Sequence, residues 1–229
     1  MKITKKLTKV NFTDKNSTKR IKYIVIHYVG ATGTAKNNVD YFYNVYRGVS
    51  AHYFVGHAGE IYQCVDDADI AWHCGTTGTY KHKYCRNSNS IGIEMCCRKD
   101  GNGNWYFEEE TVAATVELVK YLMKKYNVPI GNVLRHYDIT GKQCPQPYIN
   151  AARWANFKNL VVAAANKIEV GDKVKLTSGA TYYDGKKIPA WVKLSTLYVR
   201  EIKGDRVIVS TQRSGAITGA VKMKYLKEV

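Results

Sequence analysis

The chain has 229 residues, with 35 lysines and arginines against 19 aspartates and glutamates, which gives a net charge of +16. This charge predicts a polyanionic partner and excludes a polycation, and nucleic acid, anionic membrane and anionic cell-wall polymer all fit it equally well. The length and the apolar fraction of 45% suit one large domain followed by a small one.

Residues 1–14 are basic and polar and contain no apolar run. We therefore expect neither a signal peptide nor a transmembrane segment there, and synthesis in the cytoplasm with reduced cysteines. Five of the six cysteines are interpreted as packing or strand residues: Cys64, Cys74, Cys85, Cys96 and Cys97. A Cys74–Cys85 bridge, or a second metal site that includes His82, is the alternative.

The first predicted strand covers residues 21–28, which are rich in β-branched and aromatic side chains. His27 stands near its carboxyl end, where ligands collect in open α/β sheets. A core histidine with satisfied hydrogen bonds is the alternative. A turn and a helix at about residues 35–46 should follow, with the aromatic side chains of the helix in the core.

Residues 50–55 and 61–65 flank a glycine-containing turn and predict a β-hairpin. The polar loop at residues 76–89 could form one wall of a cleft, and His73, just before it, either lines that wall or has a structural role. Residues 90–97 predict a central strand in which Glu94 is anomalous, because a lone carboxylate is seldom buried unless it is paired or functional. Glu94 is therefore either a general base or a side chain that faces solvent at a sheet edge.

Helices are expected at about residues 108–126 and 150–167. From about residue 168 the pattern changes to short alternating strands without a helical period, and a small barrel is the natural closure. One of the strands is expected at residues 190–192. These patterns predict two domains, residues 1–166 and 167–229.

His136 and Cys144 lie eight positions apart in a segment that Gly141 and Pro145 mark as a loop. A loop can bring both side chains to one point, and imidazole and thiolate are good zinc ligands. A catalytic zinc usually has three protein ligands and one open position, and His27 supplies the third ligand. The sequence thus predicts a zinc site formed by His27, His136 and Cys144.

A zinc-bound water with a pKa of about 7 could attack an amide at neutral pH. Glu94 would take the proton of this water and pass it to the leaving amine, and Lys142 would stabilise the negative charge on the tetrahedral oxygen. This is the chemistry of a metal-assisted amide hydrolase, and it leaves deacetylase, protease and amidase open.

The strand-end His27, the Ser90-Ile91-Gly92-Ile93-Glu94 segment, and His136 with Lys142 and Cys144 together resemble the zinc-dependent N-acetylmuramoyl-L-alanine amidases. These include phage endolysins and bacterial autolysins and share the fold of peptidoglycan recognition proteins. The resemblance covers roughly residues 20–165. It implies an α/β fold in which helices flank a mixed central sheet, and cleavage of the amide between N-acetylmuramic acid and L-alanine.

The resemblance also implies roles for single residues. His27, His136 and Cys144 would bind Zn²⁺, and Glu94 and Lys142 would be catalytic. We further expect three side chains to contribute to the substrate groove: His52, Trp72 and His73.

The C-terminal part resembles a bacterial SH3-like cell-wall-binding domain through residues 171–174, 197–199 and 215–219. Its aromatic side chains could form a face for sugar or peptide or could fill the barrel core: Tyr182, Tyr183, Trp191 and Tyr198. The expected partners are peptidoglycan and anionic wall polymers. We expect an endolysin that acts at the cell wall after its release.

Two other classes remain open. One is a wall-binding protein with a purely structural zinc, and the other is a cysteine–histidine peptidase with Cys144 as the nucleophile. A nucleic-acid binder fits the charge, but the sequence contains no recognition helix or basic–aromatic motif that supports it.

Overall fold

The computed structural model describes residues 1–165 and 167–229. The chain divides into two compact units, Met1–Ala165 and Asn166–Val229. The expected boundary and the expected end of the last large helix both involve residue 166, which lies outside the described residues. Each unit has a hydrophobic core of its own.

The first unit is built on a six-stranded sheet with the strand order β1-β4-β3-β5-β2-β8. Its strands are β1 (Ile3–Lys5), β2 (Tyr23–Tyr28), β3 (Tyr53–Val55), β4 (Ile61–Gln63), β5 (Ser90–Met95) and β8 (Val133–Arg135). Only the hairpin pair β3–β4 is antiparallel, and the other neighbouring pairs are parallel. The expected mixed sheet is thus confirmed. A two-stranded sheet, β6 (Arg98–Lys99) with β7 (Trp105–Tyr106), stands apart from it.

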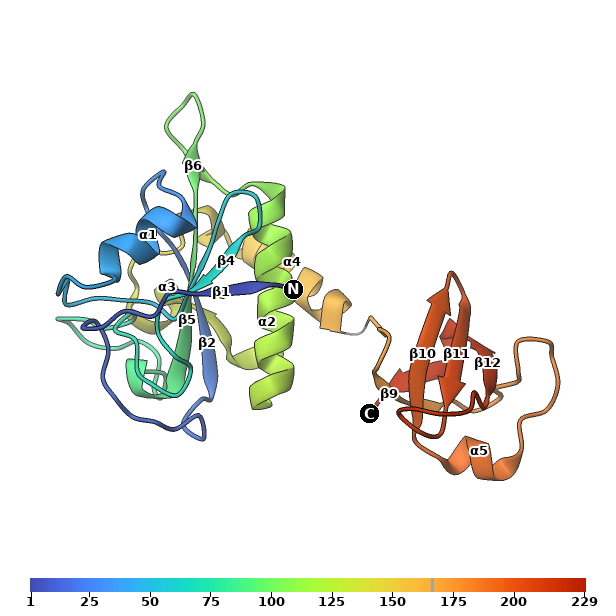
Figure 1. Ribbon diagram of the computed structural model, residues 1–229. Coiled ribbons are helices and arrows are strands. Elements are labelled where there is room, and N and C mark those ends of the chain that lie inside the picture. Colours follow the sequence, from blue (N-terminus) through green and yellow to red (C-terminus); the bar gives the residue numbers. More distant parts are fainter. Residues whose placement is uncertain (166) are drawn as a thin grey trace. The chain divides into compact units, whose positions relative to one another are not determined.

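Helices cover both faces of this sheet, as Figure 1 shows. They are α1 (Ala35–Phe42), α2 (Glu109–Tyr126), α3 (His136–Thr140) and α4 (Ala151–Ala165), with 3-10 turns at Asn87–Asn89, Ile130–Asn132 and Gln146–Tyr148. Helix α2 and helix α4 pack against one face and α1 against the other. Helix α1 begins at a capping box on Thr34 and ends four residues before the expected residue 46.

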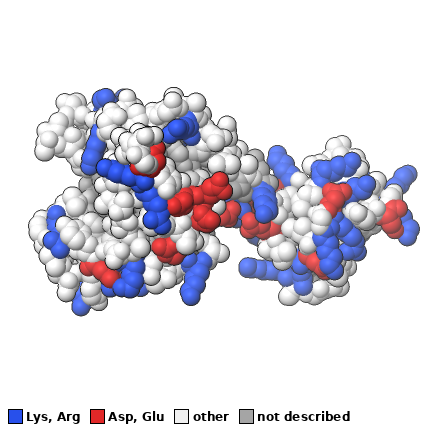
Figure 2. Space-filling model, turned by 90° about the horizontal axis from the view of Figure 1, so that it is seen from above, with Lys and Arg blue, Asp and Glu red and all other residues white. Residues whose placement is uncertain are grey.

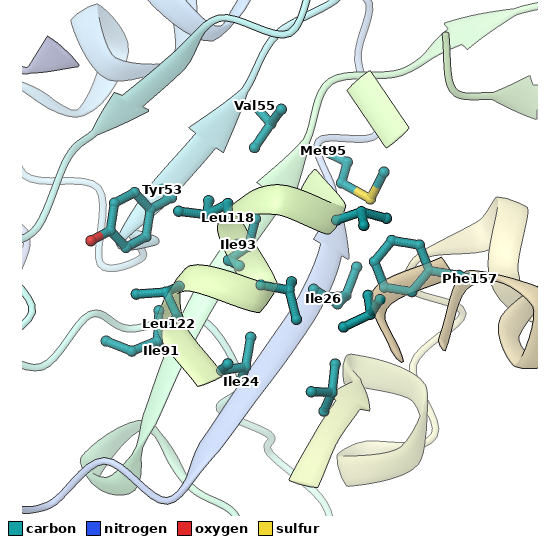
Figure 3. Close-up of a cluster of buried hydrophobic side chains, with 14 of the residues drawn as sticks. Ile24, Ile26, Tyr53, Val55, Ile91, Ile93, Met95, Leu118, Leu122 and Phe157 are labelled. Atoms are coloured by element: carbon teal, nitrogen blue, oxygen red, sulfur yellow. The ribbon is translucent and has the colours of Figure 1, made fainter. Parts of the chain in front are cut away.

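Successive side chains of β2 and β5 point to opposite faces of the sheet, so core residues lie on one face and the candidate site residues on the other. Ile26 of β2 and Ile93 of β5 belong to the cluster that packs under Leu118 of α2 (Figure 3). Because successive strand residues point to opposite faces, His27 and Glu94, one position further on, point to the face away from α2. Helix packing therefore fixes the sheet face on which the site is formed.

The expected loop between His136 and Cys144 begins instead as the short helix α3. Gly141 ends this helix with a positive φ of 82°, a conformation that glycine adopts without steric cost. The chain then folds back, and the Tyr137 N–H donates to the Cys144 carbonyl at 2.8 Å. The fold-back that the sequence predicted is present, and it is formed by one helical turn that ends at Gly141.

The second unit contains a five-stranded antiparallel sheet with the order β12-β11-β10-β9-β13. Its strands are β9 (Lys173–Leu176), β10 (Leu197–Lys203), β11 (Arg206–Ser210), β12 (Gly219–Lys222) and β13 (Leu226–Glu228), with a 3-10 turn at Met223–Tyr225. The strand expected at residues 190–192 is wrong, because helix α5 (Ala190–Leu194) occupies this segment. Pro189 directly precedes the helix, where a fixed φ and a missing N–H are tolerated.

All six cysteines are free and buried, and burial agrees with a packing role for the five outside the predicted zinc site. Among the described residues, His82 forms no group of three potential metal ligands with these cysteines, and its Nδ1 accepts the Cys85 backbone N–H at 2.9 Å. Within residues 1–165 and 167–229, the only group of three potential ligands is His27, His136 and Cys144. In the same part of the chain, no helix is long and apolar enough to span a membrane.

Candidate metal and catalytic site

Two segments far apart in the sequence bring His27 together with His136 and Cys144, with one potential ligand atom of each within 4.8 Å of the others. His27 lies near the end of β2. His136 follows directly after β8, the parallel neighbour in which Arg135 pairs with Ile26. The fold-back after α3 adds Cys144. The structure thus brings together the three residues predicted as ligands.

The atoms of this cluster fit a bound zinc ion. The Cys144 Sγ lies 3.6 Å from the His27 Nδ1. The His136 Nε2 is buried and has no hydrogen-bond partner among the described residues, which is rare for a buried polar atom unless an ion or water satisfies it. Two imidazole nitrogens and one sulfur are a ligand set that zinc prefers, and three protein ligands leave a position for water.

Burial decides the protonation of these ligands. It lowers the pKa of His136 to about 4, assisted by the charges of Lys142 and His73, and lowers the pKa of His27 well below its usual value. Both rings are therefore neutral at pH 7 and can offer a lone pair. Burial also raises the pKa of Cys144 to about 12, so coordination by its sulfur releases a proton.

Glu94 lies beside this cluster. It pairs in register with His27 of β2 and with Phe54 of β3, so its strand is interior to the sheet and the sheet-edge alternative is wrong. Its Oε2 is buried without a hydrogen-bond partner among the described residues. Burial raises the pKa of Glu94 to about 8, and the charge of Lys142 opposes this shift.

A cavity of about 350 Å³ opens over these side chains, and Lys142 lines it from the loop after α3. A second cavity of about 730 Å³ shares Lys142, His136 and Trp72 with the first, so the two adjoin, and we refer to them together as the groove. Trp72 is held in the wall by a 2.9 Å hydrogen bond from its Nε1 to the Thr13 Oγ1. The geometry thus places Glu94, Lys142 and Trp72 in one groove with the ligand cluster.

His52 does not belong to the groove, which corrects its expected role in substrate binding. Its side chain is fully buried and lines neither cavity. The ring Nδ1 accepts the Gly92 N–H at 3.0 Å, and the Nε2 lies 3.3 Å from the Asp69 carbonyl oxygen. Both nitrogens are engaged with backbone, so His52 links β5 to the segment before Trp72.

His73 lines both cavities, and it also contacts the candidate metal ligand His27. Its Nδ1 lies 3.0 Å from the His27 Nε2, and its Nε2 lies 3.1 Å from the Ser90 Oγ. The buried thiols of Cys74 and Cys85 lie next to each other and beside this pair. Both ring nitrogens of His73 are thus occupied by protein.

Sequence reasoning missed several lining residues. Asn38 and Phe42 project from α1, and Tyr28 follows His27 at the end of β2. The aromatic side chains of α1 were interpreted only as core. The position of Tyr28, directly after a predicted ligand at a strand end, was a usable signal for a lining residue.

A mixed sheet with a histidine–histidine–cysteine cluster and a half-buried carboxylate at its carboxyl edge is an arrangement typical of metal-dependent hydrolases. Residues 17–147, more than half of the chain, match the family model described as N-acetylmuramoyl-L-alanine amidase. The chain therefore belongs to the N-acetylmuramoyl-L-alanine amidase family, as the sequence resemblance predicted.

Individual proteins agree with this assignment. A probable N-acetylmuramoyl-L-alanine amidase of Bacillus licheniformis is 30% identical over 81% of this chain and 54% of the relative. The structure of PlyL is 28% identical and covers 70% of this chain and 97% of its own, with a TM-score of 0.59. A mutant endolysin from Bacillus subtilis, also 28% identical, covers 70% and 99% with a TM-score of 0.56. The chain spans about half the length of the curated relatives it matches.

Proposed function

We propose that this chain is a zinc-dependent amidase that hydrolyses the bond between N-acetylmuramic acid and L-alanine in peptidoglycan. The observation that carries this proposal is the cluster of His27, His136 and Cys144 within 4.8 Å, beside the half-buried side chain of Glu94. Family membership supports amide hydrolysis, and the nitrogen and sulfur ligands support zinc.

When bound, zinc would supply Lewis acidity that activates water and polarises the amide carbonyl at neutral pH. Glu94 takes the proton of the attacking water and returns it to the departing amine of L-alanine. A pKa of about 8 suits this exchange, because a group that titrates near the working pH both accepts and donates a proton efficiently. The Lys142 ammonium group stabilises the negative charge that develops on the carbonyl oxygen.

The second unit is proposed to be an SH3-like domain that binds the cell wall and raises the local concentration of the catalytic unit on an insoluble substrate. Residues 168–229 contain 12 lysines and arginines and 6 aspartates and glutamates. Basic side chains are prominent on the face of this unit seen in Figure 2. This charge suits anionic wall polymers. In the proposed role, the protein acts as an endolysin at the wall after its release.

A cysteine–histidine peptidase is the competing function, because the Cys144 Sγ and the His27 Nδ1 are 3.6 Å apart. A nucleophilic cysteine needs a lowered thiol pKa. Burial instead raises the pKa of Cys144 to about 12, which favours the role of metal ligand.

The test is mass spectrometry of soluble products from purified peptidoglycan, with native protein, chelated protein and the Glu94→Ala variant. The amidase predicts free stem peptides that begin with L-alanine, an intact glycan, and loss of these products on chelation and in the variant. Cleavage within the stem peptide that survives chelation but not thiol alkylation would identify the peptidase. Retained wall binding without any products would leave a recognition protein.

A further inference from the structure

A series of buried polar contacts connects His27, one of the candidate metal ligands, to Ser90 at the start of β5. The His27 Nε2 lies 3.0 Å from the His73 Nδ1, and the His73 Nε2 lies 3.1 Å from the Ser90 Oγ. The Ser90 Oγ in turn lies 2.7 Å from the Arg86 carbonyl oxygen. The side chains of His27, His73 and Ser90 are all buried, with His73 at the wall of the cavities.

The last contact fixes the hydrogen-bond direction at Ser90, and with a neutral His73 ring that direction extends to His27. A carbonyl oxygen only accepts, so the single Ser90 hydroxyl proton is donated to Arg86. The Ser90 oxygen then accepts from His73, whose proton is on Nε2. A neutral His73 therefore accepts at Nδ1, and the His27 proton is on Nε2. The His27 Nδ1 is left with a free lone pair, and this is the nitrogen 3.6 Å from the Cys144 Sγ.

The His73 ring packs closely against the backbone of β5, at a position where only glycine leaves room for it. A Cβ atom added to Gly92 would lie 2.5 Å from the His73 Cγ and 2.8 Å from two other ring atoms, so the ring rests directly on the β5 backbone. The His73 and Cys74 backbone N–H groups both donate to the Asn87 Oδ1, at 3.1 and 2.7 Å. The ring is thus held from below and through its own backbone.

We propose that His73 and Ser90 are positioning residues for the metal site, which hold His27 in the tautomer that turns a bare Nδ1 toward Cys144. This inference rests on the zinc site proposed above. It reassigns His73 from substrate binding, because neither ring nitrogen is free for a ligand. Outer partners of metal-bound histidines generally fix tautomer and ring orientation in this way.

The direct test is a long-range ¹H–¹⁵N NMR spectrum of histidine-labelled protein, recorded with and without zinc. We expect His73 and His27 to carry their protons on Nε2 in the zinc-loaded protein, and His73 to keep this tautomer without zinc. A His73 proton on Nδ1 would overturn the proposal. The metal-free spectrum tests the hydrogen bonds from His27 through His73 to Ser90 even if zinc does not bind. A wrong zinc site and a wrong hydrogen-bond arrangement therefore give different results.

The second test is zinc affinity, measured by competition with a chromogenic chelator. His73→Phe keeps a ring over Gly92 but removes the acceptor for His27, and loss of an outer partner typically lowers metal affinity by ~10–100-fold. Ser90→Ala should weaken affinity less and let His73 sample both tautomers in the NMR spectrum. His57→Gln, which alters a histidine outside the groove, is the control. Wild-type affinity in both His73→Phe and Ser90→Ala, with unchanged tautomers in Ser90→Ala, would contradict the proposal.

Discussion

His27 and Glu94 are register partners on the adjacent parallel strands β2 and β5. Parallel partners in one register point to the same face of the sheet, so a candidate metal ligand and a candidate acid–base group stand side by side on hydrogen-bonded backbone. Their separation is therefore set by the sheet and not by a mobile loop. This is the kind of rigid support that a catalytic constellation requires.

Replacement of Glu94 should lower the rate of amide hydrolysis and leave metal binding unchanged. In Glu94→Gln we expect a loss of amidase turnover of about 10²–10⁴-fold, because proton transfer by a positioned side chain typically contributes this much. Zinc stoichiometry should remain that of the wild type, since Glu94 is outside the ligand cluster. Peptide release from peptidoglycan and metal analysis of the same preparation measure the two effects. Full activity in the variant would remove Glu94 from the mechanism.

Replacement of Lys142 should lower turnover without unfolding the protein. Lys142 is exposed and lines both cavities, so Lys142→Met should cost about 10²–10³-fold in kcat through the lost stabilisation of the oxyanion. The matched control is Lys19→Met, an exposed lysine that lines neither cavity. Equal turnover in the two variants would show that Lys142 acts only through the net charge.

Removal of the metal should destabilise the first unit. A ligand that binds only the folded state, at a concentration of 1,000 Kd, contributes about 4 kcal/mol to the free energy of unfolding. A chelator should therefore lower the Tm of the first unit of the wild-type protein in calorimetry. In Cys144→Ala, which lacks one ligand, the chelator should have little effect. An equal decrease of Tm in both proteins would argue against the assigned ligand set.

The stability of the metal-free protein should depend on pH through Glu94. Its pKa is about 8 in the folded state and near 4.5 when unfolded, so ionisation costs more in the folded protein. The free energy of unfolding should thus fall as pH rises from about 4.5 to about 8. The Glu94→Gln variant lacks this term and should be the more stable protein at pH 8, by on the order of 1–3 kcal/mol after allowance for its partial exposure.

Urea unfolding of chelated protein at pH 4 and pH 8 measures this difference, which should vanish at the lower pH. Glu117→Gln, an exposed glutamate of α2, is the control and should show no comparable trend. A stability gap that is the same at both pH values would contradict the raised pKa of Glu94.

A methyl group at Gly92 should disturb the metal site indirectly. The added Cβ would lie 2.5 Å from the His73 Cγ, so Gly92→Ala forces the ring to move. Overpacking of this kind costs about 1–3 kcal/mol, and zinc affinity should fall with it. Gly101→Ala is the control, because a Cβ there meets no atom within 4 Å. Unchanged stability and affinity in Gly92→Ala would show that His73 has room to shift.

The sequence alone predicted the elements that carry the site and most of its residues. Residues 21–28 and 90–97 were recognisable as buried strands from their β-branched character, and a carboxylate at position 94 was conspicuous there. His136, Gly141 and Cys144 lie close enough in sequence for a fold-back to be predicted from local turn chemistry. The resemblance of these motifs then gave the family.

Strand order, register and buried contacts were decided by the tertiary structure. His27 pairs with Glu94, 67 positions away, and His73 contacts Ser90, 17 positions away. The burial of His52 likewise depends on segments that are distant in sequence. Residue type and spacing do not encode such contacts, because they depend on which strands become neighbours and which faces the helices cover. The sequence therefore determined which chemical groups were available, and helix packing on one face of the sheet decided which of them meet on the other.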